Sequence, residues 1–227
     1  MKTLSLDTST IRGSVALLEN GTVLCELRLA SLETHAARLL RSIEFLLGGA
    51  GWRLEDVALI AAGLGPGSFT GIRIGLSTAL GLAQTLRIPF AGISGLDALA
   101  HGHAYLGGRI GIVMDAQRGQ VYYAEYAIVG GRVRKIRTAG LWYPRDLKSM
   151  LAGRRLRLIG DGARRHLAEM GSPAEPWEII DPEPYLAGPI GQLALTRKRS
   201  WRRGEFLACD PLYIRPPDAR KPASRNA

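Results

Sequence analysis

Cysteine and long apolar stretches are the features that this sequence most clearly lacks. Cys25 and Cys209 are the only cysteines among 227 residues, so neither a disulfide framework nor a cysteine-based metal site is expected. No apolar run approaches the ~20 residues that a membrane-spanning helix needs. The first residues, Met1 to Asp7, lack the charged and apolar regions of a signal peptide. These features exclude disulfide-rich secreted proteins and membrane-spanning proteins, and they predict a cytoplasmic location.

The composition is otherwise ordinary, but the charge is uneven along the chain. Residues 1–131 hold 10 Lys and Arg against 10 Asp and Glu, and residues 132–227 hold 20 against 10, so the whole net charge of +10 lies in the second part. A one-sided basic surface suits a polyanion such as RNA. A surface merely solvated by arginine explains the charge equally well, because the arginines are not interleaved with aromatic residues for base stacking. These arginines are Arg154, Arg155, Arg157, Arg164 and Arg165.

One pattern occurs twice in the chain: a strand that ends in aspartate, a loop, a second strand, a tight turn and a third strand. The first copy uses residues 4–7, 14–18 and 22–27, and the second uses residues 110–115, 121–128 and 132–138. Asp7 and Asp115 occupy matching places, and Asn20-Gly21 is a strong hairpin signal. The duplication predicts an α/β protein of two related lobes, each with a mixed sheet flanked by helices.

The elements outside the duplicated pattern give the expected domain division. We expect helices over residues 34–47, 71–86 and from 95, and strands over residues 57–64 and 89–93, with a strand over 157–159 and a helix over 163–170 further on. Prolines 173, 176, 182, 184 and 189 are expected to interrupt regular structure after residue 172. The predicted division is a first lobe of residues 1–106, a reduced second lobe of residues 107–214, and a basic, proline-rich tail of residues 215–227.

The glycine-rich segment 63–75 is the most distinctive stretch of the sequence. A turn of this kind before a helix could hold an anion on its backbone N–H groups. No Lys-Ser/Thr pair follows Gly71, however, and Ser68 and Pro66 stand where other known motifs need glycine. In the helix that comes next, Gly71, Gly75, Ala79 and Ala83 form a stripe that would admit a close neighbouring helix. Since this helix is apolar on nearly every face, we expect part of it to be an oligomer interface.

Polar residues at the strand ends give two open interpretations. Asp7 and Asp115, with hydroxyls from Thr8 and Ser9, could hold a cation between phosphate-binding hairpins, or they could cap turns locally. His35 would need a second histidine one helical turn on to bind a metal, but position 39 is leucine. A metal site and a nucleophilic triad are therefore not expected.

Taken together, six segments of the sequence resemble one family, TsaB (also called YeaZ). They are residues 4–10, 34–40, 65–75, 92–99, 114–123 and 211–215. The resemblance is dense over residues 3–126 and sparse after Thr138, and residues 172–189 have no clear counterpart. It implies an ASKHA (actin/Hsp70/sugar-kinase-like) fold and a role in making threonylcarbamoyladenosine beside the anticodon of tRNA. In that system the paralogue TsaD carries the metal and the transferase site, and TsaE supplies the ATPase activity.

The resemblance also implies what this chain does. It is expected to be a non-catalytic subunit, a pseudo-enzyme that binds TsaD through two first-lobe helices, pairs with itself when TsaD is absent, and meets TsaE and tRNA through the complex. The paralogue's metal motif has histidines at i and i+4, of which only His35 remains here. The implied interface residues are His35, Arg38, Leu39, Ser42, Ile72, Arg73, Leu76 and Leu80.

The nucleotide site of the family is degraded in this sequence. Gly160-Asp161-Gly162-Ala163 is a remnant of an adenosine-binding turn, so Asp7, Thr8, Ser9 and Asp115 mark degenerate phosphate hairpins and no cofactor is expected. Arg215 and Lys221 are candidates for contact with tRNA. The alternatives are an autonomous ATPase or peptidase of the same fold, and an RNA-binding module driven by the basic second half.

Overall fold

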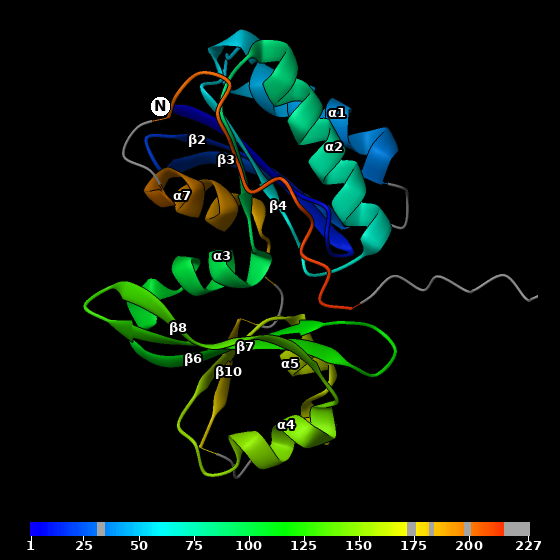
Figure 1. Ribbon diagram of the computed structural model, residues 1–227, viewed down its shortest axis with the longest axis vertical. Helices are drawn as coiled ribbons and strands as arrows, with labels where there is room; N and C mark the ends of the chain where they lie inside the picture. The colour runs from blue at the N-terminus through cyan, green and yellow to red at the C-terminus, as the bar shows by residue number, and fades with distance from the viewer. Residues whose placement is uncertain (31–34, 172–175, 182–183, 198–200, 216–227) are drawn as a thin grey trace, which may run out of the picture.

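The computed structural model of the protein describes residues 1–30, 35–171, 176–181, 184–197 and 201–215. Two β-sheets lie one above the other, each with helices on its faces (Figure 1). The six-stranded first sheet has the order β11-β5-β4-β1-β2-β3, with β1 Lys2–Asp7, β2 Arg12–Glu19, β3 Thr22–Ala30, β4 Leu59–Gly63, β5 Phe90–Ile93 and β11 Phe206–Leu207. The five-stranded second sheet has the order β10-β9-β6-β7-β8, with β6 Gly108–Asp115, β7 Val121–Val129, β8 Arg132–Trp142, β9 Arg157–Ile159 and β10 Glu178–Asp181.

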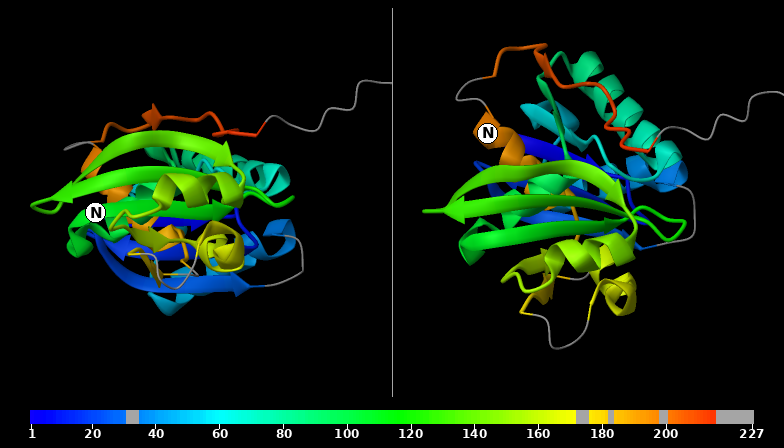
Figure 2. Two further views of the ribbon diagram at one scale, coloured as in Figure 1. Left: turned by 90° about the horizontal axis from the view of Figure 1, so that it is seen from below. Right: turned by 60° about the horizontal axis from the view of Figure 1, so that its bottom comes forward.

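The helices complete a stack of five layers (Figure 1), and Figure 2 shows the same elements from below and in a tilted view. They are α1 His35–Gly49, α2 Phe69–Leu86, α3 Gly95–Gly102, α4 Pro144–Leu151, α5 Asp161–Arg165, α6 Leu167–Met170 and α7 Ala187–Arg197, with short 3₁₀ turns at Leu54–Asp56 and Ala104–Leu106. α1 and α2 share an apolar cluster with the outer face of the first sheet. α3 and α7 lie between the two sheets, and α4 to α6 pack on the outer face of the second.

The predicted duplication is confirmed by the pairing of the strands. β1, β2 and β3 form an antiparallel meander, and β4 joins β1 in parallel. β6, β7 and β8 form the same meander, and β9 joins β6 in parallel. The order β4-β1-β2-β3 in the first sheet is therefore repeated as β9-β6-β7-β8 in the second. The chain has the two-lobed α/β arrangement of the ASKHA fold.

Several predicted boundaries differ from the structure. The helix expected over residues 163–170 is split into α5 and α6 at His166, and β8 continues four residues beyond Thr138. The expectation that prolines interrupt regular structure after residue 172 is wrong for β10 and α7. Pro189 is the third residue of α7, where its missing N–H leaves no hydrogen bond of the helix unmade.

α7 returns from the second lobe to the first sheet. Ser5 Oγ donates a hydrogen bond to Ala187 O (2.7 Å), and Ala187 N donates to Ser14 Oγ (3.0 Å). Gly188 N donates to Glu26 Oε1 (3.1 Å). β11 then extends the same sheet beyond β5. α7 and β11, which fall in the range predicted for the second lobe, thus lie with the first sheet.

Asp97 of α3 holds side chains from three other elements at the junction between the lobes. Tyr126 Oη of β7 donates to Asp97 Oδ1 (2.7 Å), and Lys135 Nζ of β8 lies 2.7 Å from the same oxygen. Arg197 of α7 lies 3.5 Å from Asp97 Oδ2. Burial raises the pKa of Tyr126, so its hydroxyl remains a donor to this carboxylate.

In the part of the chain that the structure describes, no helix is long and apolar enough to cross a membrane.

Candidate functional site

The glycine-rich segment and the turn after β1 pack directly against each other. Thr8 Oγ1 donates a hydrogen bond to Gly71 O (2.7 Å), and Ser68 N donates to Ser9 O (2.6 Å). Ser68 is the N-cap of α2, and its Oγ accepts from Gly71 N (3.2 Å). The N–H groups of Ser68 and Gly71, which could otherwise hold an anion, are therefore used within the chain.

The glycines of this segment are explained by the same contact. A Cβ on Gly67 would overlap the carbonyl oxygen of Ser9, and a Cβ on Gly71 would overlap that of Thr8. A Cβ on Gly75 would overlap Thr8 Oγ1. The expectation that this stripe admits a neighbouring helix is thus wrong for its glycine half, which faces the turn after β1. The sequence pattern did not distinguish contact with a neighbouring helix from contact with the turn after β1, because both require small residues on one helix face.

Asp7 and Asp115 make the same local contact in the two lobes. Asp7 Oδ2 accepts from the backbone N of Ser9 (3.2 Å) and from Ser9 Oγ (3.0 Å). Asp115 Oδ1 accepts from the backbone N of Gln117 (3.1 Å), again two residues on. Both carboxylates therefore cap local turns, as one of the two interpretations of the sequence predicts.

The two carboxylates differ in what else surrounds them. Asp115 Oδ2 lies 2.7 Å from Arg165 Nη1, and Asp115 Oδ1 lies 3.4 Å from His166 Nε2. Asp7 is buried, its Oδ1 has no hydrogen-bond partner among the described residues, and burial raises its pKa to about 6. The described residues contain no group of three or more His, Cys, Asp and Glu that could hold a metal ion.

The turn before α5 repeats the first-lobe packing in the second lobe. A Cβ on Gly160 would overlap Val113 O, and one on Gly162 would lie 2.7 Å from the backbone carbon of Met114. Asp161 Oδ1 accepts from Asp115 N (3.0 Å), and burial raises the pKa of Asp161. Residues 160–163, predicted as a remnant of an adenosine-binding turn, pack against the end of β6.

α1 and α2 lie side by side on the outer face of the first sheet (Figure 1), but only some of the implied interface residues are on the surface. Leu39, Ser42, Ile72 and Leu76 are buried within this chain. Arg73 is exposed, while Arg38 and Leu80 are partly buried. His35 begins α1, and its side chain lies outside the described part of the structure.

Large apolar side chains also protrude from α1. Phe45 is 70% exposed and Leu40 is 53% exposed, whereas Leu82 is partly buried against the first-lobe core. The sequence pattern gave no sign that Leu40 is a surface residue, because its spacing to the buried residues Ile43 and Leu47 fits the helical period. The 3.6-residue period predicts which direction the buried face of a helix points, but not how wide that face is. Leu40 lies just outside the buried face.

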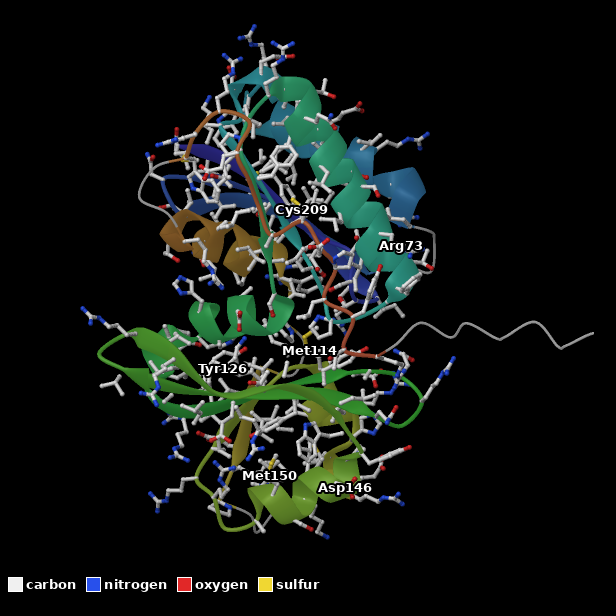
Figure 3. The ribbon with its side chains drawn as sticks, in the orientation of Figure 1. Arg73, Met114, Tyr126, Asp146, Met150 and Cys209 are labelled. Carbon is white, nitrogen blue, oxygen red and sulfur yellow. The ribbon has the colours of Figure 1, made fainter. Side chains whose placement is uncertain are left out.

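The two arginines expected to contact a partner both hold the C-terminal segment. The Arg73 guanidinium lies 3.8 Å over the Phe69 ring, and Arg73 Nε donates to Tyr213 Oη (3.2 Å). Figure 3 shows Arg73 on α2 beside that segment. Arg215 donates to Ala116 O (2.6 Å) and to Gln120 Oε1 (2.5 Å) in the loop between β6 and β7. The guanidinium predicted to contact tRNA thus binds the second lobe of its own chain, and Lys221 lies outside the described residues.

Comparisons with known proteins show which families this sequence is similar to. The family model described as "TsaD: tRNA N6-adenosine threonylcarbamoyltransferase" matches residues 28–148. The Escherichia coli protein named "tRNA threonylcarbamoyladenosine biosynthesis protein TsaB" is 41% identical over 128 residues, which are 56% of this chain and 55% of that protein. The Bacillus subtilis protein of the same name is 35% identical over 136 residues, 60% and 59% of the two chains. The chain thus spans somewhat more than half the length of these curated relatives.

Solved structures extend the likeness over nearly the whole chain. A Pseudomonas aeruginosa protein described as similar to peptidase YeaZ is 30% identical, with a TM-score of 0.76, and the match covers 94% of this chain and 99% of that one. The chain belongs to the TsaB/YeaZ family. The match to the TsaD model is that of a paralogue. Component A of (R)-2-hydroxyglutaryl-CoA dehydratase from Acidaminococcus fermentans shares the fold alone, at 12% identity and a TM-score of 0.52 over 87% of this chain and 98% of that one.

Replacing Gly71 with alanine tests the packing of the turn after β1 on α2. The new Cβ would overlap the backbone of Thr8, so we expect Gly71→Ala to lower the free energy of unfolding by about 2–3 kcal/mol. Gly81 lies on the same helix with nothing within 4 Å of a Cβ, so Gly81→Ala should raise it by about 0.5–1 kcal/mol. Urea unfolding of both variants measures the difference. Equal effects would show that Gly71 is not a close-contact site.

The buried carboxyl of Asp7 predicts a pH dependence of stability. Its pKa of about 6 lies above the ordinary value of 3.8, so the folded chain holds this proton more tightly than the unfolded chain does. The free energy of unfolding contributed by Asp7 should therefore fall by about 2 kcal/mol as the pH rises from 4 to 6. In Asp7→Asn this decrease should disappear. Urea unfolding of both proteins between pH 4 and 8 checks it, and parallel curves would contradict the prediction.

Proposed function

We propose that this chain takes part in forming N6-threonylcarbamoyladenosine on tRNA, as a non-catalytic subunit that binds and stabilises the catalytic subunit TsaD. The names of its relatives and the match to the TsaD model support the pathway. The partners proposed are TsaD directly, TsaE and tRNA through the complex, and a second copy of this chain when TsaD is absent. The complex acts in the cytoplasm, and this subunit needs no cofactor of its own.

The side chain at position 39 is the observation that carries the non-catalytic role. A metal pair on α1 would need a second ligand one turn after His35. Leu39 occupies that position, is 1% exposed and belongs to the apolar cluster under α1 and α2. This helix turn contributes to the core at the place where the paralogue binds its metal. The carboxylate of Asp115 is likewise engaged by Arg165 and His166.

The outer face of α1 supports a docking role for the first lobe. Phe45 and Leu40 are both more than half exposed, although they are large and apolar. Exposed Arg41 and Glu44 lie between them in the sequence. Large apolar side chains surrounded by charged residues are typical of protein–protein contacts, in which a few of them supply most of the binding free energy.

The test is light-scattering gel filtration of this chain with and without its cognate TsaD. We expect a homodimer that converts to a heterodimer with TsaD. Phe45→Arg should weaken this complex at least about tenfold, because a buried charge without a partner costs more than about 1.4 kcal/mol. Leu76→Arg is unsuitable, since Leu76 is 5% exposed and the variant would disturb the core.

Tyr105→Arg is the matched control for this test. Tyr105 is also aromatic and is 76% exposed, but it lies in the 3₁₀ turn Ala104–Leu106, away from α1 and α2. It should bind TsaD as the wild type does and should support threonylcarbamoyladenosine formation when mixed with TsaD and TsaE. A wild-type chain that ignores TsaD, or a Phe45→Arg variant that binds it normally, would refute the proposed docking face.

A further inference from the structure

Among the residues that the structure describes, helices cover only part of the outer face of the second sheet. α4, α5 and α6 pack against the part that carries Val113, Val121 and Tyr123. The turn between β7 and β8 projects beyond α4 (Figure 1), and Val129 at this end is 76% exposed. We propose that this uncovered end of the sheet, which is lined by arginines, binds the phosphate backbone of RNA.

The strand register brings these arginines to one face. Tyr126 and Ile128 of β7 pack into the cluster between the sheets, so Ala127 and Val129 point to the outer face. Opposite residues of antiparallel strands share a face. Arg109 of β6 and Arg134 of β8 both pair with Ala127, and Arg132 pairs with Val129. Arg109, Ala127 and Arg134 therefore form one row across three strands, with the small alanine between two guanidinium groups.

A buried carboxylate fixes two of the arginines at this surface. Glu125 Oε1 lies 2.5 Å from Arg154 Nη2 and 3.6 Å from Arg109 Nη1. Its other oxygen accepts a hydrogen bond from Tyr123 Oη (3.2 Å). The Arg109 side chain remains 60% exposed, so Glu125 orients this guanidinium without enclosing it. Glu125 is a positioning residue for the surface.

The balance of charge at this end is strongly positive. Five guanidinium groups lie on or beside the outer face, and Glu125 is the one carboxylate that contacts them among the described residues. They belong to Arg109, Arg132, Arg134, Arg137 and Arg154. No carboxylate in the described part of the chain pairs with Arg132 or Arg134, whereas Arg165, Arg157 and Lys135 elsewhere in the lobe are all paired. Figure 3 shows nitrogen-tipped side chains beneath this end of the lower sheet.

The chemistry of the surface favours a nucleic-acid backbone over bases. Guanidinium groups bind phosphate oxygens with two parallel hydrogen bonds. The rings on this face, Tyr123 and Trp142, are buried or partly buried, so they do not offer the exposed stacking surface that single-stranded bases need. Contact should therefore be independent of base sequence and should suit a paired stem. The choice of RNA, and of tRNA in particular, rests on the proposed function.

The test is fluorescence anisotropy of the full chain with a labelled, unmodified tRNA transcript at several salt concentrations. The variant Arg109→Gln/Arg132→Gln/Arg134→Gln removes three surface charges and leaves Glu125 and Arg154 in place. We expect its affinity to fall about tenfold or more, and the slope of log K against log salt to decrease by about 2–3, close to one unit per lost phosphate contact. The control Arg53→Gln/Arg87→Gln/Arg203→Gln loses the same charge from exposed positions outside the second sheet and should bind within about twofold of the wild type.

Each outcome bears on the proposal separately from the proposed function. Equal losses in the two triple variants would show a general charge effect and overturn the RNA surface. The proposal would also be overturned if the wild-type chain bound no tRNA at about 50 mM salt. It would be overturned as well if these arginines were needed for binding to phosphatidylserine vesicles but not for binding to RNA. A patch variant that still forms the TsaD complex but loses tRNA affinity supports it. If the wild type binds tRNA through the patch yet ignores TsaD, the subunit role fails and the surface stands.

Discussion

The first lobe depends on one close contact, in which the turn after β1 lies directly on the first turns of α2. Thr8 and Ser9 occupy the space that side chains would fill at Gly67, Gly71 and Gly75. Because no Cβ separates them, α2 approaches the sheet closely enough for Ile72 and Leu76 to be buried beneath it. α1 then packs beside α2, and the pair leaves its outer face to solvent. The position of the proposed docking face results from these glycines.

The second lobe uses the same device on a smaller scale. Gly160 and Gly162 let α5 approach the end of β6, as the glycines of α2 do at the end of β1. In both lobes an aspartate closes the turn through the backbone N–H two residues on. The repeated aspartates thus reflect a shared way of joining a strand to a helix. Their surroundings differ, because Asp7 is enclosed and Asp115 is paired with arginine and histidine.

The sequence predicted most of the duplicated strands because each copy carries its own local signals, a strand ending in aspartate and a tight turn. It did not predict α7, since the helix comes after several prolines and is held by contacts with Ser5, Ser14 and Glu26 far away in the chain. It also did not separate surface from core on α1 and α2. Leu39 and Leu40 are neighbours of the same type, yet one is buried and the other is half exposed. Only the packing of α1 on the sheet decides between them.

The segment from Phe206 to Arg215 runs along both lobes and is fastened to each. β11 pairs with β5, Leu212 N donates to Leu64 O (2.7 Å), and Arg215 ends on the loop between β6 and β7. To move the lobes apart, the segment from Phe206 to Arg215 would have to extend or lose its contacts at one end. The contacts of Asp97 would also have to break. These two sets of contacts both join the first lobe to the second. We therefore expect a displacement of α1 and α2 to move the second sheet with them, because these contacts oppose a change in the angle between the lobes.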